Sequence, residues 1–137
     1  MLAGMLGCED TTTASHEATL TPELRQAHDD AATLDFYRSR VQPIFQQDCY
    51  RCHAGLNRKG EFRLKTRADL KKGGKHGAAV VPGDPDRSLL VQQLRQGSGV
   101  EHPMPPPPQQ KMPDADRIVI ERWVQAGAIM PDTPDGR

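Results

Sequence analysis

Large apolar side chains are scarce in this chain of 137 residues. Three phenylalanines, two tyrosines and one tryptophan are its only aromatic residues, whereas glycine and proline each occur twelve times. This composition excludes an extensive hydrophobic core and predicts many turns. We therefore expect one folded unit of about a hundred residues, in which a bound cofactor supplies part of the missing apolar volume.

The chain also lacks an excess of either charge and lacks long hydrophobic runs. Its 18 basic and 18 acidic residues balance, so there is no general attraction to polyanions and we expect no binding to nucleic acid. No stretch approaches the roughly 20 apolar residues that a membrane-spanning helix needs. Any membrane attachment must therefore use something other than such a helix.

Cysteine occurs only three times, and the first, Cys8, follows an apolar stub that ends in Gly7. This arrangement is typical of the end of a bacterial lipoprotein signal, in which the cysteine carries the lipid after cleavage. The seven preceding residues are too few for a whole signal, so we expect the natural start to lie upstream. The alternative is an ordinary thiol on a frayed terminus. The lipoprotein interpretation predicts a lipid anchor at Cys8, on the periplasmic side of a bacterial cell envelope.

The pattern along the chain divides it into four parts. We expect residues 1–8 to be the signal remnant and 9–32 a polar tether, with a helix start favoured at residue 22. Residues 33–130 are expected to form the folded domain, and 131–137 a flexible tail.

Helical spacing and capping residues predict the elements of the domain. We expect a helix between 22 and 42, a short one after Pro43, one that begins near Asp84 or Asp86, and one from Asp114 to just before Gly127. Residues 55–77 are interpreted as loops with at most a small hairpin. The predicted fold is all-α, with three to four short helices joined by long loops that wrap a ligand.

The other two cysteines lie in the pentapeptide CYRCH, residues 49–53. Two intervening residues place the thiols about one helical turn apart, which matches the two vinyl groups on one edge of haem, and each thiol can add to a vinyl as a thioether. His53 follows directly, so its imidazole would lie beneath the iron as the proximal ligand. The motif predicts one covalently bound haem c held by Cys49, Cys52 and His53.

Two other uses of these side chains stay open. A thioredoxin-type redox pair normally follows a buried strand, and no run rich in valine or isoleucine precedes Cys49. A structural zinc site needs a fourth ligand, adjacent cysteine and histidine do not easily reach one tetrahedral ion, and the chain has no second CxxC and no HxxxH. Haem attachment therefore explains CYRCH best.

A haem iron has a sixth position that a neutral thioether or imidazole usually fills. The candidates are Met104, Met112, His102 and His76. Met104 is favoured because the prolines of HPMPPPP would hold its thioether at little entropic cost. Met112 comes second. Ligation by His102 would lower the reduction potential, and His76, in a glycine-rich loop, is more simply an exposed residue.

Further residues have more modest interpretations. Arg51, Arg63 and Lys65 are candidates for pairing with the haem propionates, although surface charges usually do no more than solvate the chain. Trp123, at helical spacing with neighbouring apolar residues, is best explained as a core residue packed on the haem or on the helix that carries CYRCH.

Four strings occur in order: VQPIFQQDCYRCH, VVPGDPDRSLL, HPMPPPP and IVIERWVQAGA. Over about residues 36–129 they resemble the planctomycete-type cytochrome c domain, a small all-α unit with a single haem. The resemblance implies haem attachment at Cys49 and Cys52, with His53 as the proximal ligand. It also implies that the methionine of the MPP element, Met104, is the distal ligand.

The chain departs from that family at one point. Where the family often has an acidic or small pair after its double glycine, this sequence has Lys75 and His76. The expected function is that of a mono-haem c-type cytochrome, not an enzyme, which carries single electrons between other redox proteins, either alone or as the haem domain of a larger oxidoreductase. The alternatives are a haem-based sensor with a displaceable sixth ligand and a structural zinc module.

Overall fold

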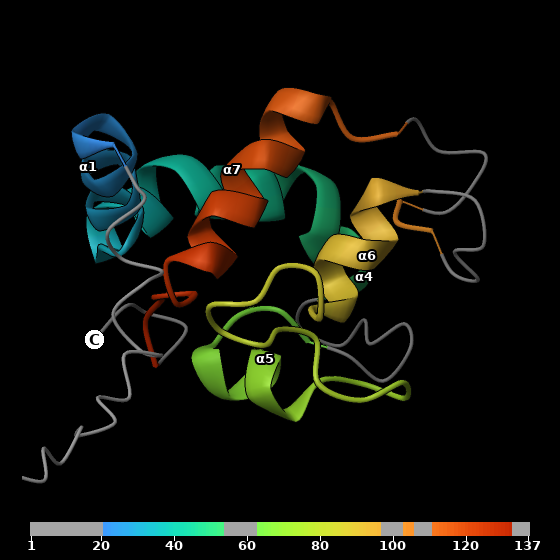
Figure 1. Ribbon diagram of the computed structural model, residues 1–137. Helices are drawn as coiled ribbons and strands as arrows, with labels where there is room; N and C mark the ends of the chain where they lie inside the picture. The colour runs from blue at the N-terminus through green and yellow to red at the C-terminus, as the bar shows by residue number, and fades with distance from the viewer. Residues whose placement is uncertain (1–20, 54–62, 97–102, 106–110, 133–137) are drawn as a thin grey trace, which may run out of the picture.

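The computed structural model describes residues 21–53, 63–96, 103–105 and 111–132. Within these ranges every regular element is helical and no strand is present, which confirms the predicted all-α class. Figure 1 shows the C-terminal helix lying across the helices of the N-terminal half, with the remaining helices beside and below it. Five helices are present in this part of the chain, compared with the three to four that the sequence predicted.

The first helix, α1, spans Pro22–Ala31. It begins where the sequence pattern favours a start, because the Thr21 hydroxyl accepts the Leu24 backbone N–H at 3.3 Å and Pro22 occupies the first turn. The helix does not continue to residue 42. The Thr33 hydroxyl accepts the Phe36 N–H at 3.1 Å and caps a second helix after a two-residue break.

This second helix, residues 34–53, carries CYRCH at its end and is called the motif helix below. It consists of α2 (Leu34–Phe36), a π-helical turn η2 (Tyr37–Val41), α3 (Gln42–Ile44), a second π-helical turn η3 (Phe45–Cys49) and α4 (Tyr50–His53).

Pro43 changes the hydrogen bonding of the motif helix without ending it. The Gln42 N–H donates to the Tyr37 carbonyl and the Tyr50 N–H to the Phe45 carbonyl, each five residues back. These wider turns flank the position at which proline supplies no backbone donor. The predicted restart at Pro43 is thus a change of helix type, and the real break lies earlier, at residues 32–33.

The region predicted to be loop contains a helix, α5 (Arg67–Lys72), so that part of the prediction is wrong. The Thr66 hydroxyl accepts the Asp69 N–H at 3.1 Å, and the Asp69 carboxylate accepts the Thr66 N–H at 3.0 Å. This capping box satisfies two backbone donors and stabilises a helix of only six residues. A tight turn follows, in which Gly74 and Gly77 form an antiparallel bridge.

Helix α6 (Leu89–Arg95) begins later than predicted, because residues 84–87 form a turn in which the Asp84 carboxylate accepts the Arg87 N–H at 3.1 Å. Ser88 occupies the N-cap. Helix α7 (Asp114–Gln125) has the predicted start at Asp114 and the predicted end just before Gly127, whose positive φ of 106° suits glycine.

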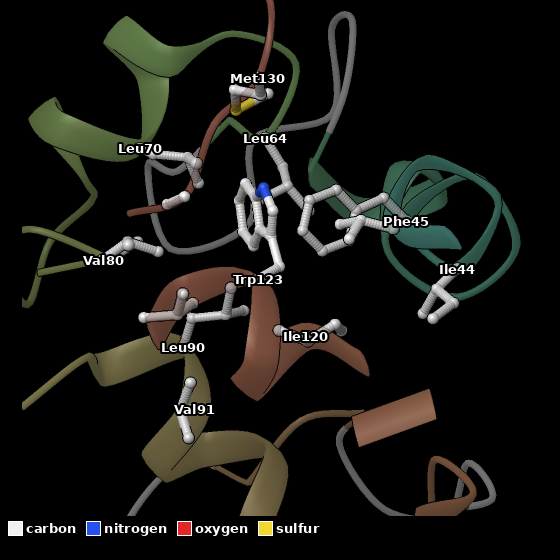
Figure 2. Packing of buried hydrophobic residues seen from close by; sticks show 14 of the residues in the cluster. Ile44, Phe45, Leu64, Leu70, Val80, Leu90, Val91, Ile120, Trp123 and Met130 are labelled. Carbon is white, nitrogen blue, oxygen red and sulfur yellow. The ribbon is translucent and has the colours of Figure 1, made fainter. Parts of the chain in front are cut away.

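The core lies where α7 contacts α1, η2 and α6. Trp123 is fully buried, and the centroid of its ring system lies 5.9 Å from the ring of Tyr37 and 5.6 Å from that of Phe45. Its indole N–H donates to the Ile129 carbonyl at 2.7 Å. Figure 2 shows Trp123 near the centre of this cluster, with Phe45 to one side of it and Leu70 and Val80 to the other. The prediction that Trp123 is a core residue packed on the helix that carries CYRCH is confirmed.

Candidate haem site

The structure places CYRCH across the end of η3 and all of α4. Cys49 and His53 are four residues apart, so they lie on the same side of the motif helix, about one turn from each other. Both are half-buried, and Cys49 packs against the hydrophobic core. Of Cys52 only the backbone is described, and it is helical. The local geometry therefore presents a thiol and an imidazole in the register that the motif requires.

Tyr50, between the two cysteines, ties the motif to the core. A side-chain hydrogen bond joins it to Tyr37, which is 1% exposed. Burial raises the pKa of Tyr37, and the neighbouring Tyr50 raises it further. On its other side, the Tyr50 ring lies 5.6 Å from the Lys65 Nζ atom, a cation–π contact. The sequence analysis did not predict that Tyr50 holds the motif against the core. The signal available for this role was an aromatic residue between the two cysteines of CxxCH.

The end of the motif helix is held by the segment that follows it. The Leu64 N–H donates to the His53 carbonyl at 3.0 Å, and the Leu64 side chain is only 1% exposed. Residues 54–62 lie outside the described part of the chain, but their two flanks thus meet at a backbone hydrogen bond. This contact satisfies a carbonyl at the helix end and fixes the backbone of the proposed proximal ligand.

A pair of acidic side chains lies next to Cys49. Burial raises the pKa of the Asp48 carboxyl, and the charge of Asp116, on the first turn of α7, raises it further. The interaction indicates that the start of α7 lies near the end of η3.

Met104 reaches the same core as Cys49 from a different part of the chain. It is half-buried and packs against the hydrophobic cluster. Its N–H donates to the Gln93 carbonyl at 3.1 Å, and the Gln96 amide donates to the Met104 and Pro105 carbonyls at 2.9 and 3.2 Å. The backbone on both sides of the thioether is therefore fastened to the end of α6.

The competing ligand candidates have different surroundings. Met112 is 4% exposed inside the core, and Met130, equally buried, lies there too. His76 is exposed in the turn between Gly74 and Gly77. His102 and the proposed lipid attachment site Cys8 lie outside the described residues. The role of Met104 as the distal ligand remains a prediction.

The residues present fit a covalently attached haem. The donor set combines thiols and an imidazole on one helix with a half-buried thioether from another segment, which is the chemistry that haem c attachment and ligation require. In addition, the buried Nε atoms of Arg63 and Arg67 have no hydrogen-bond acceptor within the described ranges. Buried cationic donors of this kind are suited to an anionic group that completes the site.

Other metal or membrane-spanning features were sought in the same residues. No group of three or more histidine, cysteine, aspartate or glutamate side chains that could hold a metal ion occurs in the described ranges. None of the described helices combines the length and apolar character needed to cross a bilayer.

Comparison with known proteins gives one match. Residues 49–108 match the family model described as planctomycete cytochrome C. The matched segment begins at the first cysteine of CYRCH and includes α5, α6 and Met104. No curated protein and no solved structure matches the chain.

Proposed function

Since residues 49–108 match the family model described as planctomycete cytochrome C, we propose that the protein carries single electrons between redox partners through one covalently bound haem c. The observation that supports this proposal most directly is the placement of CYRCH at the end of a helix, with Cys49 and His53 on one side and the core behind them. In this proposal Cys49 and Cys52 hold the cofactor, and His53 and Met104 ligate its iron.

The haem supplies one-electron oxidation and reduction when it is bound. The chain positions it and limits the access of water. His53 would provide the proximal imidazole, whose backbone the Leu64 N–H holds at 3.0 Å. Met104 would close the sixth position with a thioether, which raises the reduction potential relative to histidine at the same place. Tyr50 keeps the motif in register with the core through Tyr37.

An iron with both axial positions filled by protein is closed to substrates, and this favours electron transfer over catalysis. We further propose that donor and acceptor are other redox proteins, and that the domain acts alone or beside a larger oxidoreductase. Haem attachment outside the cytoplasm agrees with a lipid anchor at Cys8 that faces the periplasm. Both features would place the site in an oxidising envelope compartment.

The test is an optical spectrum of protein made together with a cytochrome c maturation system. Sharp reduced bands that survive acid organic extraction are expected, because thioether bonds retain the haem when non-covalent haem is removed. Colourless protein after extraction would contradict the proposal and would leave zinc or thiol chemistry for CYRCH.

The axial ligand is tested by exchanging one methionine at a time for leucine, which removes the sulfur and nearly conserves the volume. We expect the oxidised far-red band of an iron–sulfur(Met) bond to disappear in Met104→Leu and to persist in Met112→Leu. Met130→Leu is the control for a core methionine. Loss of the band in Met112→Leu alone would move the ligand to Met112. A wild-type spectrum without the band would favour an open or displaceable sixth site and hence a sensor.

A further inference from the structure

Two arginines in the segment that follows the motif helix in the sequence carry polar atoms without a hydrogen-bond partner among the described residues. The Nε atoms of Arg63 and Arg67 are buried and have no hydrogen-bond acceptor within the described residues. They are the only buried side-chain nitrogen or oxygen atoms in those ranges with this property. The other arginines near the core differ, since Arg95 and Arg117 are both paired with the Glu121 carboxylate on α7.

Both arginines belong to the segment that is fastened to the end of the motif helix. Arg63 directly precedes Leu64, whose N–H donates to the His53 carbonyl at 3.0 Å. Arg67 opens α5, and its own N–H donates to the Pro131 carbonyl at 3.3 Å. The two residues therefore lie on either side of Leu64 in one short stretch, and Leu64 makes the contact that holds the backbone of the proposed proximal ligand.

The acidic residue of this segment is already engaged. The Asp69 carboxylate accepts the N–H groups of Lys65 and Thr66 at 3.1 and 3.0 Å, as part of the cap of α5. The neighbouring cation has a different role too, because Lys65 is exposed and lies over the Tyr50 ring. An acceptor from outside the described residues is thus needed to satisfy the two Nε–H groups.

Leaving such donors without an acceptor is unfavourable. A buried donor without a partner costs about 1–3 kcal/mol, and more when the group is charged. Arginine presents Nε–H and a terminal N–H as a planar fork that matches the two oxygens of a carboxylate. Haem brings two carboxylates, its propionates, and these anions also require compensation when they leave water.

We propose that Arg63 and Arg67 bind the propionate carboxylates of the haem. This inference rests on the proposed function, since it requires a haem attached at CYRCH. It retains Arg63 from the cations that the sequence nominated as partners, adds Arg67, and gives Lys65 the separate role of contacting Tyr50. The pair acts as an anchor for the polar edge of the cofactor, separate from the covalent and axial bonds.

The experiment uses the haem-loaded full chain with ¹³C at the propionate carboxyls, studied by NMR in the reduced state. Compared with wild type, Arg63→Gln and Arg67→Gln are expected to shift at least one labelled carboxyl resonance. Both variants are also expected to lower the midpoint potential, because a positive charge near the iron favours the reduced form. Lys71→Gln is the matched control, since it removes an exposed charge from the same helix as Arg67.

The conservative variants Arg63→Lys and Arg67→Lys distinguish the contribution of the two-pronged arginine hydrogen bonds from that of the positive charge. They keep a cation but lack Nε, so the resonance should move while the potential stays close to that of wild type. If a glutamine variant fails to fold, these lysine variants still decide the matter through the resonance.

The outcomes that overturn this inference differ from those that overturn the proposed function. Wild-type protein without extraction-resistant haem would overturn both. Haem-loaded protein whose labelled resonances are the same in the arginine variants and in wild type would overturn the propionate assignment alone.

Discussion

The core around Trp123 differs from the side of the molecule that carries CYRCH in how completely the chain packs its own side chains and supplies hydrogen-bond partners for its own polar atoms. In the core, three aromatic rings pack together and the buried indole N–H has a carbonyl acceptor at 2.7 Å. On the motif side, Cys49, His53 and Met104 are half-buried, and the segment that follows the motif helix contains two buried arginine nitrogens without an acceptor among the described residues. The core is completed by the protein, whereas the motif side is arranged for a group that the sequence does not contain.

The largest effect is expected from a variant that disrupts the motif side and leaves the core intact. Replacing Cys49 and Cys52 together by alanine should abolish extraction-resistant haem, because no thioether can form. The measurement is the absorbance of reduced protein after acid organic extraction. Cys8→Ala is the matched control, since it removes the third cysteine of the chain outside the motif. Loss of covalent haem in the control, or its retention in the double variant, would contradict the assignment of these cysteines.

The second largest effect is expected from a variant that disrupts the core. Trp123→Ala should destabilise the haem-loaded protein by about 3–5 kcal/mol, because it leaves a large cavity among Tyr37, Phe45 and Leu64. Ile118, on the same helix but 42% exposed, provides the control, and Ile118→Ala should stay within about 0.5 kcal/mol of wild type. Urea unfolding followed by circular dichroism measures both. Equal losses in the two variants would mean that the packing around Trp123 is not the main source of stability.

Ser88 extends the comparison, because it is a buried polar residue whose hydroxyl finds its hydrogen-bond partners within the chain. It is 0% exposed, and its hydroxyl accepts the Val81 N–H at 2.9 Å and donates to the Asp84 carbonyl at 2.8 Å. Ser88→Ala should cost about 1–3 kcal/mol, since the Val81 N–H would lose its acceptor. Ser39→Ala, at an exposed serine, should cost far less in the same unfolding experiment. A cost for Ser88→Ala no larger than that for Ser39→Ala would show that water replaces the hydroxyl.

The two regions also differ in how much of them the sequence predicts. The ends of α7 follow from local signals, Asp114 at the start and Gly127 after the end, so they were predicted. The haem motif was likewise recognisable because its chemistry is contained in five neighbouring residues. Helix α5 was missed because it is short and rich in lysine, although the TRAD string contains its capping box.

What the sequence could not give depends on contacts between distant segments. Met104 and Met112 are both methionines beside proline, and only packing separates the buried Met112 from the half-buried Met104. Arg67 has no local feature that distinguishes it from the surrounding cations. Its position depends on a hydrogen bond to Pro131, which is far away in sequence.

The smallest expected effect concerns the charges that join α6 to α7. Burial by itself raises the pKa of Glu121, but hydrogen bonds from Arg95 and Arg117, together with their charges, outweigh burial and lower it. A carboxyl with a lowered folded-state pKa stabilises the protein above its unfolded pKa of about 4.3, and this contribution is lost as the pH falls through the folded value. Glu121→Gln should therefore cost about 0.5–1 kcal/mol at pH 7, with a difference that shrinks below pH ~4.

Asp86 offers the matched control for this last prediction, because it pairs with the same Arg95 at 2.7 Å but its side chain is 82% exposed. Solvent screens an exposed pair, so Asp86→Asn should change the free energy of unfolding less than Glu121→Gln does. Both are measured by urea unfolding between pH 3 and 7, a range of about four units across the carboxyl titration. If the two variants behave alike, the half-buried position of Glu121 adds nothing. The pairing of Arg95 with Glu121 would then be a feature of the structure that contributes no more to stability than its exposed pairing with Asp86.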